Sequence, residues 1–281
     1  MRSGAGTRDW VSYDDVVAAY DSALGRNAYL RLAEDVVAVL GLPRGGVVLD
    51  VGCGTGAATS FAQTAVGPPG LAVGLDVSLA MLRHARAKGL NRMVAGALPG
   101  LPFRSATFDG VAASLVVSHV EAHEAAFRDM ARVLKPGGRL GVTAWTSIRR
   151  DARSARLGAS AVLRDVATRF VSPESLARAY AAAVPREDWF AQRRHLTAAF
   201  ASGGLERVNI REGRYAASLS TEEYFVMMSS MALGRFLRYE LGAEGWREFE
   251  ERAIGELRAR IGERVEYMAP AYLAVGRRPF R

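Results

Sequence analysis

The sequence of 281 residues contains a single cysteine, Cys53, only two lysines, and no long uninterrupted apolar run. One cysteine excludes an internal disulfide, which is consistent with a reducing compartment. No segment approaches the roughly 20 apolar residues that a membrane-spanning helix needs, and the first residues lack the apolar segment of a secretory signal. We therefore expect a cytoplasmic protein with no membrane span.

The overall composition is that of an ordinary globular protein. Hydrophobic residues make up 49% of the chain and charged residues 23%, which excludes wholesale disorder and a disulfide-dependent scaffold. The net charge of +8 would suit a nucleic-acid groove. However, Lys88 and Lys135 are the only lysines among the 37 basic residues. Arginines dispersed over the surface, from a GC-rich coding sequence, therefore explain the charge better, and nucleic acid is not the expected partner.

The central part of the sequence alternates strand-like and helical segments. Strands are predicted at residues 47–51, 71–76, 91–95, 109–115 and 139–145. Helices are predicted at residues 57–65 and from the capping Ser78 to residue 88. A third helix carries Phe127 and Met130 on one face and is expected to end at Lys135–Gly138. This alternation predicts a parallel sheet with helices on both faces and a ligand crevice at the carboxyl ends of its strands.

The flanking regions have a different pattern. Residues 1–45 are expected to form an N-terminal helical cap, and residues 46–148 the cofactor-binding α/β core. Residues 149–281 would supply the remainder of the sheet, with strands at 205–219 and 264–276, and two helical inserts at 149–204 and 220–262. We expect the inserts to form a cover over the crevice, the second one starting with the capping signal Ser220 to Glu223.

A glycine-rich segment follows the first predicted strand. It runs from Asp50 to Gly56, with glycine at positions 52, 54 and 56, and it would let the backbone approach a ligand closely. Together with Asp76, about 20 residues further on, it also fits the dinucleotide fingerprint. Asp50 would repel a pyrophosphate and favours a cationic ligand. S-adenosylmethionine is cationic and carries no phosphate, and Asp76 could accept hydrogen bonds from its ribose hydroxyls.

Four motifs in this order resemble the class I S-adenosylmethionine-dependent methyltransferases that act on small molecules. They are Val48–Gly56, Gly74–Ser78 with Met81-Leu82, Leu101–Phe103 with Phe108-Asp109, and Arg132–Gly138. The resemblance covers roughly residues 40–146. It implies a Rossmann-like α/β fold with a seven-stranded, mostly parallel sheet, helices on both faces and one antiparallel strand, with residues 205–219 and 264–276 as the last hairpin.

The resemblance also implies roles in binding S-adenosylmethionine and its product S-adenosylhomocysteine. Asp50 would lie at the ammonium group and Asp76 at the ribose. The remaining cofactor residues are expected to be Gly52, Cys53, Gly54 and Gly56 at the loop, Val77 and Met81 at the adenine, and Ser114 after the fourth strand. Met81 could equally well be a residue of the helix core.

One position departs from the family pattern. Relatives often have an aspartate that holds the adenine amino group just before Leu-Pro-Phe, whereas this chain has Ala97 there. The backbone at Ala97 and Leu98 would then hold the adenine. Loss of one charge-assisted hydrogen bond would weaken binding by about 1–3 kcal/mol without abolishing it.

The candidate catalytic residue is His119, which follows the fourth strand where the reaction takes place in this fold. It would act as a general base, although a solvated histidine at a helix start is the simpler interpretation. His119, Glu121 and His123 do not have the spacing of a zinc helix, so no metal is expected. The chain also lacks the Asn/Asp-Pro-Pro-aromatic motif of many enzymes that methylate amino groups of bases.

Aromatic and methionine residues in the flanking regions are candidates for the walls of the site. Tyr13 and Tyr20 could border the substrate and cap the cofactor, and Phe225 and Met228 could form an apolar substrate wall. Each of the four could instead belong to ordinary helix packing.

Three functions remain compatible with the sequence. The first is methylation of oxygen, carbon or nitrogen in a small organic molecule, such as a secondary metabolite, by a monomer or homodimer. The second is a cyclisation or rearrangement in which the cofactor is bound only structurally. The third, which the charge alone motivates, is RNA modification.

Overall fold

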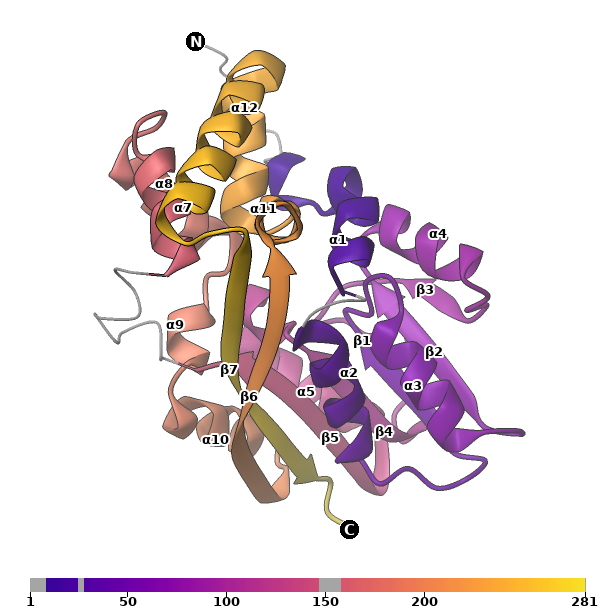
Figure 1. Ribbon diagram of the computed structural model, residues 1–281. Helices are drawn as coiled ribbons and strands as arrows, with labels where there is room; N and C mark the ends of the chain where they lie inside the picture. The colour runs from indigo at the N-terminus through magenta and orange to yellow at the C-terminus, as the bar shows by residue number, and fades with distance from the viewer. Residues whose placement is uncertain (1–8, 25–27, 147–157, 281) are drawn as a thin grey trace.

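The computed structural model describes residues 9–24, 28–146 and 158–280. Seven strands form a single sheet in the order β3-β2-β1-β4-β5-β7-β6 (Figure 1). They are β1 (Val47–Val51), β2 (Leu71–Asp76), β3 (Met93–Ala95), β4 (Phe108–Ser114), β5 (Leu134–Trp145), β6 (Glu206–Ser220) and β7 (Arg264–Arg277). Strands β1 to β5 pair in parallel, and β7 pairs antiparallel with both β5 and β6. The predicted seven-stranded sheet with one antiparallel strand is confirmed.

Helices cover both faces of this sheet. In the first half of the chain they are η1 (Asp9–Val11), η2 (Asp14–Val16), α1 (Val17–Leu24), α2 (Ala28–Ala38), α3 (Ala57–Val66), α4 (Leu79–Ala87), η3 (Val117–His119) and α5 (His123–Val133). Val48 packs with α2 and α3, whereas its neighbour Leu49 packs with α5. Because successive strand residues point to opposite faces, α2 and α3 cover one face and α5 the other.

Strand β5 begins earlier than the sequence suggests. We expected Lys135–Gly138 to end a helix, with a strand starting at Arg139; instead α5 ends at Val133 and β5 starts at Leu134. Backbone groups of this segment pair with residues near the end of the chain: Gly137 N donates to Arg278 O, and Arg278 N donates to Gly138 O. Pairing with a remote segment thus overrides the local turn signal.

The second half of the chain adds six helices to the described structure. They are α7 (Ala159–Ala167), α8 (Pro173–Ala183), α9 (Glu187–Phe190), α10 (Arg193–Ser202), α11 (Thr221–Ser229) and α12 (Ala232–Arg260). Helices α9 and α10 pack on the sheet through Phe190 and Phe200, next to Phe127 of α5. These two helices therefore belong to the core around the sheet, whereas the whole insert 149–204 was expected to cover the crevice.

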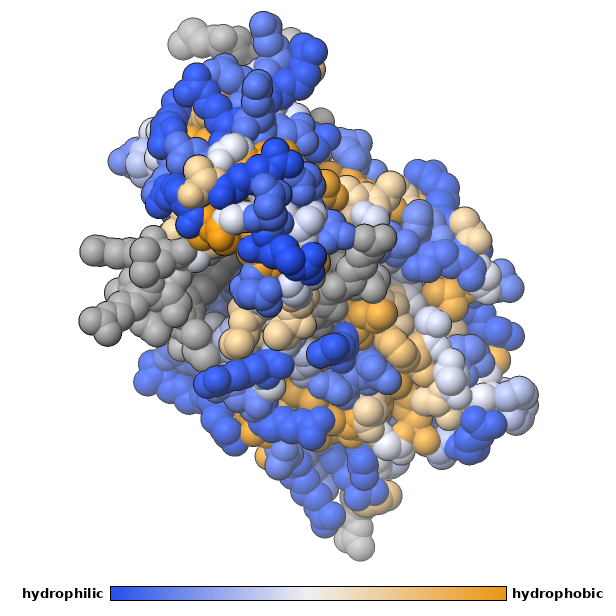
Figure 2. Space-filling model, in the orientation of Figure 1, coloured by the Kyte–Doolittle hydropathy of each residue, from blue (hydrophilic) through white to orange (hydrophobic). Residues whose placement is uncertain are grey.

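The other four helices, α7, α8, α11 and α12, form a separate layer above the sheet, which we call the cover (Figure 1). It is held by its own apolar cluster, in which Phe225 of α11 meets Trp246 and Phe249 of α12. Residues 264–270 of β7 pair with β6 alone, so this hairpin rises beyond β5 and carries the cover. The outward surface of the cover is mostly hydrophilic (Figure 2).

Within the described residues, no helix combines the length and the apolar character that crossing a bilayer requires.

The predicted helix start at Ser220 is confirmed. Its hydroxyl accepts from Glu223 N, and the Glu223 carboxylate accepts from Ser220 N in return. Such a reciprocal cap fixes where β6 ends and α11 begins.

Candidate functional site

The glycine loop between β1 and α3 forms the floor of the site. Gly52, Gly54 and Gly56 have φ angles of 64°, 53° and 88°, in the left-handed region that side chains avoid. A Cβ atom on Gly52 would lie 2.4 Å from Val116 Cγ2, so any larger residue there would collide with the segment after β4. The loop is thereby brought against the carboxyl ends of β1 and β4, where a ligand crevice was predicted.

Asp76 links this loop to the end of β2. Its Oδ2 accepts a hydrogen bond from Gly54 N at 2.8 Å and its Oδ1 accepts one from Ser78 N at 2.9 Å. Burial raises the pKa of Asp76, although the backbone donors act in the opposite direction. Each carboxylate oxygen can accept a second hydrogen bond, so the half-buried side chain can still hold two ribose hydroxyls.

Asp50 lies deeper, on β1 beneath the loop. Its side chain is 2% exposed, and its Oδ2 accepts a hydrogen bond from Thr59 Oγ1 at 2.7 Å. Burial raises the pKa of Asp50 to about 7; the hydrogen bonds from Thr59 oppose this shift and the nearby Asp76 adds to it. No lysine or arginine of the described residues forms an ion pair with it. A buried carboxylate in this state favours a cationic group beside it, as the ammonium of the expected cofactor would be.

A small cavity adjoins both the loop and Asp50. Its volume is about 50 Å³, and Tyr20 of α1 and Tyr29 of α2 are among the residues that line it. Tyr20 Cε1 lies 3.8 Å from the position of a Cβ on Gly54. Because burial raises the pKa of Tyr20, its hydroxyl stays protonated and can donate a hydrogen bond. Donors and carboxylates thus fit S-adenosylmethionine, but the tyrosines must move before a molecule of this size can enter.

The residues expected at the adenine lie at the rim of the site. Val77 is 72% exposed, Ala97 is also exposed and Leu98 is half-buried, so they offer an open apolar surface next to Asp76. Met81 is only 3% exposed and sits in the first turn of α4, where its N–H donates to Ser78. Its buried side chain is consistent with the alternative that Met81 is a helix-core residue.

The end of β4 has a strained conformation that the sequence did not reveal. Ser114 Oγ shares a hydrogen bond with Thr143 Oγ1 at 3.2 Å, and Thr143 Oγ1 accepts another from Leu115 N at 2.9 Å. Leu115 has φ of 58°, rare for a non-glycine residue, and it lines the cavity together with Ser114. Such strain is often stored at functional sites.

His119 lies beside the cover, at the end of η3. Its Nδ1 is 2.9 Å from Ala183 O of α8, and since a carbonyl only accepts, Nδ1 carries the proton and Nε2 is left with a lone pair. Burial among surrounding groups lowers the pKa of His119, yet its side chain keeps exposed surface. A ligand can therefore reach it. The Tyr13 ring lies edge-on to it, with 6.2 Å between the ring centroids.

The remaining predicted wall residues are separated by the fold. Tyr13 and Tyr20 lie together, with ring centroids 5.5 Å apart, on the core side of the cover. Phe225 is 3% exposed inside the cover, and Met228 of the same helix is partly buried against another cluster, which includes Leu257. Arg235 of α12, which the sequence pattern did not single out, lies over the Tyr13 ring at 3.7 Å.

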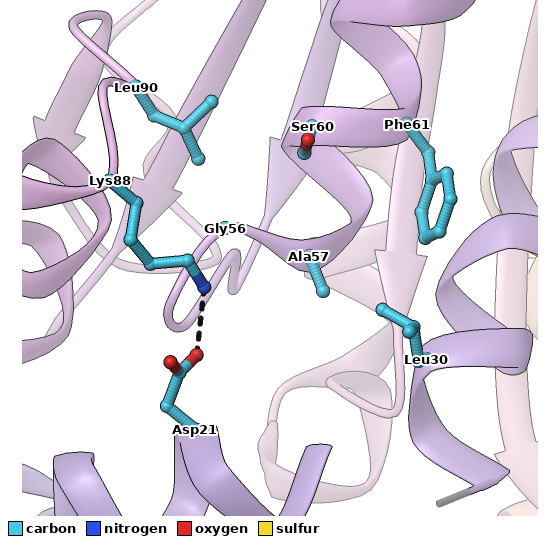
Figure 3. A pocket seen from close by; sticks show the side chains of 8 residues that line it. All are labelled: Asp21, Leu30, Gly56, Ala57, Ser60, Phe61, Lys88 and Leu90. Carbon is cyan, nitrogen blue, oxygen red and sulfur yellow. Dashed lines mark hydrogen bonds and ion pairs between the residues drawn. The ribbon is translucent and has the colours of Figure 1, made fainter. Parts of the chain in front are cut away.

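A second cavity of about 250 Å³ lies beside the glycine loop (Figure 3). Gly56 and the first turns of α3 form one side, and Asp21 and Lys88, which form an ion pair with 2.8 Å between carboxylate and ammonium, also line it. Burial acts to raise the pKa of Asp21, but hydrogen bonds, chiefly from Lys88, lower it to about 2. In the described part of the chain, no group of three or more histidines, cysteines or acids is arranged to hold a metal ion.

Comparisons with known proteins agree with this geometry. A family model described as a methyltransferase domain matches residues 49–142. A demethylmenaquinone methyltransferase of Geobacillus stearothermophilus is 32% identical over 147 residues, which cover 49% of this chain and 63% of that protein. The chain therefore spans less than two thirds of this relative's length.

Two solved structures share the fold. Phosphoethanolamine N-methyltransferase 2 of Haemonchus contortus, in complex with S-adenosylmethionine, has a TM-score of 0.57 at 17% identity over 95% of this chain and 57% of that chain. The cyclase SpnF has a TM-score of 0.56 at 20% identity over 96% and 94% of the two chains. Residues 49–142 thus match a methyltransferase domain, and the seven-stranded sheet that includes them has the Rossmann-like fold of the class I S-adenosylmethionine-dependent methyltransferases.

Proposed function

We propose that the protein transfers the methyl group of S-adenosylmethionine to a small organic molecule held between the glycine loop and the cover. The observation that carries this proposal is the pair of carboxylates at the loop. Asp50 is buried with a raised pKa and suits an ammonium group, and Asp76 keeps acceptor capacity for ribose hydroxyls. A phosphate-bearing cofactor would meet two negative charges here.

The cofactor supplies a sulfonium methyl group with an excellent leaving group, so this chain has to align the acceptor and, where needed, remove a proton. We propose that His119 Nε2 accepts the proton that the substrate loses. The bond to Ala183 O holds the ring in the tautomer with a free Nε2, and the lowered pKa keeps the ring neutral at pH 7. Leu115 and Ser114 would border the reacting atoms at the end of β4.

The substrate is proposed to be an apolar ring compound. Aromatic side chains gather below the cover, among them Tyr13, Tyr29 and Trp145, the last two rings meeting edge-on at 5.4 Å. The relative that acts on demethylmenaquinone motivates a naphthoquinol as the first compound to test. A secondary metabolite of similar polarity is the wider class.

The experiment has a binding arm and a product arm. Isothermal titration with S-adenosylmethionine should show one site per chain, and Asp76→Ala should weaken it by about tenfold or more, since hydrogen bonds to a charged acceptor are lost. Asp109→Ala is the matched control, because Asp109 also accepts a backbone N–H, from Val47, but at the opposite end of the sheet. Equal affinity in wild type and Asp76→Ala would refute the assignment.

The product arm uses 1,4-naphthoquinol and related compounds with mass spectrometry. Methyl transfer adds one methylene to the product and releases S-adenosylhomocysteine. An isomer with unchanged mass would instead indicate the cyclisation alternative. His119→Gln should lower kcat while the affinity for S-adenosylmethionine stays the same, and a variant with full kcat would remove His119 from the chemistry.

A further inference from the structure

The N-terminal segment lies between the two parts of the molecule that the reaction needs. Residues 10–22, which we call the strap, run from η1 beside α12 to α1 beside α4 (Figure 1). At one end the strap contacts the cover, and at the other it contacts the rim of the cofactor site. It is therefore placed to couple the two.

The cover holds the strap through one buried arginine. Arg235 is 5% exposed; its Nε donates to Trp10 O at 3.1 Å and its Nη2 donates to Val11 O at 3.4 Å. Its Nη1 donates to Ser230 O at 2.7 Å, which fixes the guanidinium to its own helix pair. The same group covers the Tyr13 ring at 3.7 Å. Among the described residues Arg235 forms no ion pair, so its charge is balanced by these carbonyls and this ring.

The core holds the other part of the strap at the cofactor rim. Asp14 accepts a hydrogen bond from Ser78 Oγ, and the Ser78 N–H is donated to Asp76. Further along, Asp21 pairs with His84 Nε2 at 3.0 Å and with Lys88 Nζ at 2.8 Å. These contacts place Tyr20 of the strap over Gly54.

A chain of contacts thus connects Arg235 to the cofactor site. The guanidinium packs on Tyr13, Tyr13 packs edge-on against Tyr20, and Tyr20 lines the cavity next to Gly54. With Tyr20 in this position the cavity of about 50 Å³ is too small for S-adenosylmethionine, so a cofactor that binds there has to displace Tyr20 and the strap that carries it. Lifting it breaks the contacts that Arg235 makes with Trp10, Val11 and Tyr13.

We propose that Arg235 is a positioning residue for the cofactor: from the cover, it holds the strap closed and so limits the rate at which the cofactor exchanges. The inference rests on the proposed function, because it assumes that S-adenosylmethionine occupies the glycine loop. It assigns to the cover a role beyond enclosing the substrate.

The test measures how fast S-adenosylhomocysteine leaves the full-length protein, by surface plasmon resonance. Arg235→Met should accelerate dissociation by about tenfold or more, because the strap loses its charge-assisted hydrogen bonds. Arg235→Lys keeps the charge but cannot form the same planar set of bonds, so it should fall between wild type and Arg235→Met. Arg238→Met is the matched control, since Arg238 lies on the same helix over Trp246, at 4.5 Å, away from the strap.

Hydrogen exchange separates positioning from a general loss of stability. In Arg235→Met, amides of residues 10–22 should exchange faster while those of β1 and β4 keep the wild-type rate; faster exchange throughout would overturn the proposal. Should Arg235→Met fail to fold, Arg235→Lys decides the same question by itself. A dissociation rate within twofold of wild type in a folded variant also overturns it. Absence of S-adenosylhomocysteine binding by the wild type would remove the proposed function together with this inference.

Discussion

Two carboxylates flank the glycine loop, and their different surroundings give them different tasks. Asp76 is half-buried and receives two backbone N–H bonds, so it is suited to neutral hydroxyl groups. Asp50 is almost fully buried and receives a hydrogen bond from Thr59, so it needs a cation when it ionises. Because the pKa of Asp50 is about 7, a cation that favours its ionised form should affect its protonation at physiological pH.

The first prediction concerns the pH dependence of cofactor binding. The folded-state pKa of Asp50 lies above its ordinary value, so the protonated form stabilises the cofactor-free protein at low pH, and this stabilisation is lost as the pH rises through about 7. The ammonium of the cofactor favours the ionised form. The affinity for S-adenosylhomocysteine should therefore rise about fivefold from pH 6 to pH 7, before an α-amino group begins to lose its proton near pH 8.

Asp50→Asn provides the control for this prediction. The amide has the same shape and cannot ionise, so the variant should bind more weakly and lose the rise in affinity between pH 6 and pH 7. Calorimetry in buffers of different ionisation enthalpy should also detect a proton released on binding by wild type only. The same pH profile in both proteins would show that another group is responsible.

The two acids could be placed from the sequence, whereas other residues of the site could not. Asp50 and Asp76 end neighbouring parallel strands, and the carboxyl ends of such strands meet at one edge. Arg235 and Leu115 give no comparable signal. An arginine in a helix usually indicates a solvated face, and a left-handed leucine is imposed by tertiary contacts, here with Thr143.

At the scale of elements, the bend in α12 determines the shape of the cover. Residue 242 has φ of 65° and ψ of −172° inside an otherwise helical stretch of 29 residues. Only glycine adopts this conformation readily, and residues from both sides of the bend, such as Phe236 and Phe249, join the same apolar cluster of the cover. The helical pattern of residues 220–262 did not predict the bend, because glycine can adopt both helical and left-handed backbone angles.

The second prediction compares two glycines of α12. Gly242→Ala should lower the free energy of unfolding by about 1–3 kcal/mol, because the bend requires angles that alanine avoids. Gly255→Ala should raise it by about 0.5–1 kcal/mol, because Gly255 is exposed, its φ is not in the left-handed region, and a Cβ there meets no atom within 4 Å. Urea unfolding monitored by circular dichroism measures both values. A stabilising Gly242→Ala would mean that α12 is straight in solution.

At the scale of the whole molecule, the make-up of the sheet was more predictable than the placement of the helices. The alternation of strands and helices indicates the parallel part of the sheet, and the resemblance to the methyltransferase family implied its last hairpin. The helical pattern of residues 149–204 indicates an apolar face without saying what that face contacts. Phe190 and Phe200 direct α9 and α10 to the sheet, whereas Val166 and Leu176 direct α7 and α8 to the cover.

The third prediction addresses the net charge of +8. Several exposed arginines have carboxylate partners, among them Arg169 with Glu256 and Arg260 with Asp165. Pairs of this kind place carboxylates among the surface arginines, and these negative charges oppose the attraction of a phosphate backbone. In fluorescence anisotropy with a single-stranded RNA of about 20 nucleotides, we expect binding at low salt to disappear by about 150 mM KCl, with dissociation constants weaker than ~10 µM. A submicromolar dissociation constant at about 150 mM KCl would instead favour RNA as the substrate, and methylation of that RNA would then have to be tested ahead of any quinol.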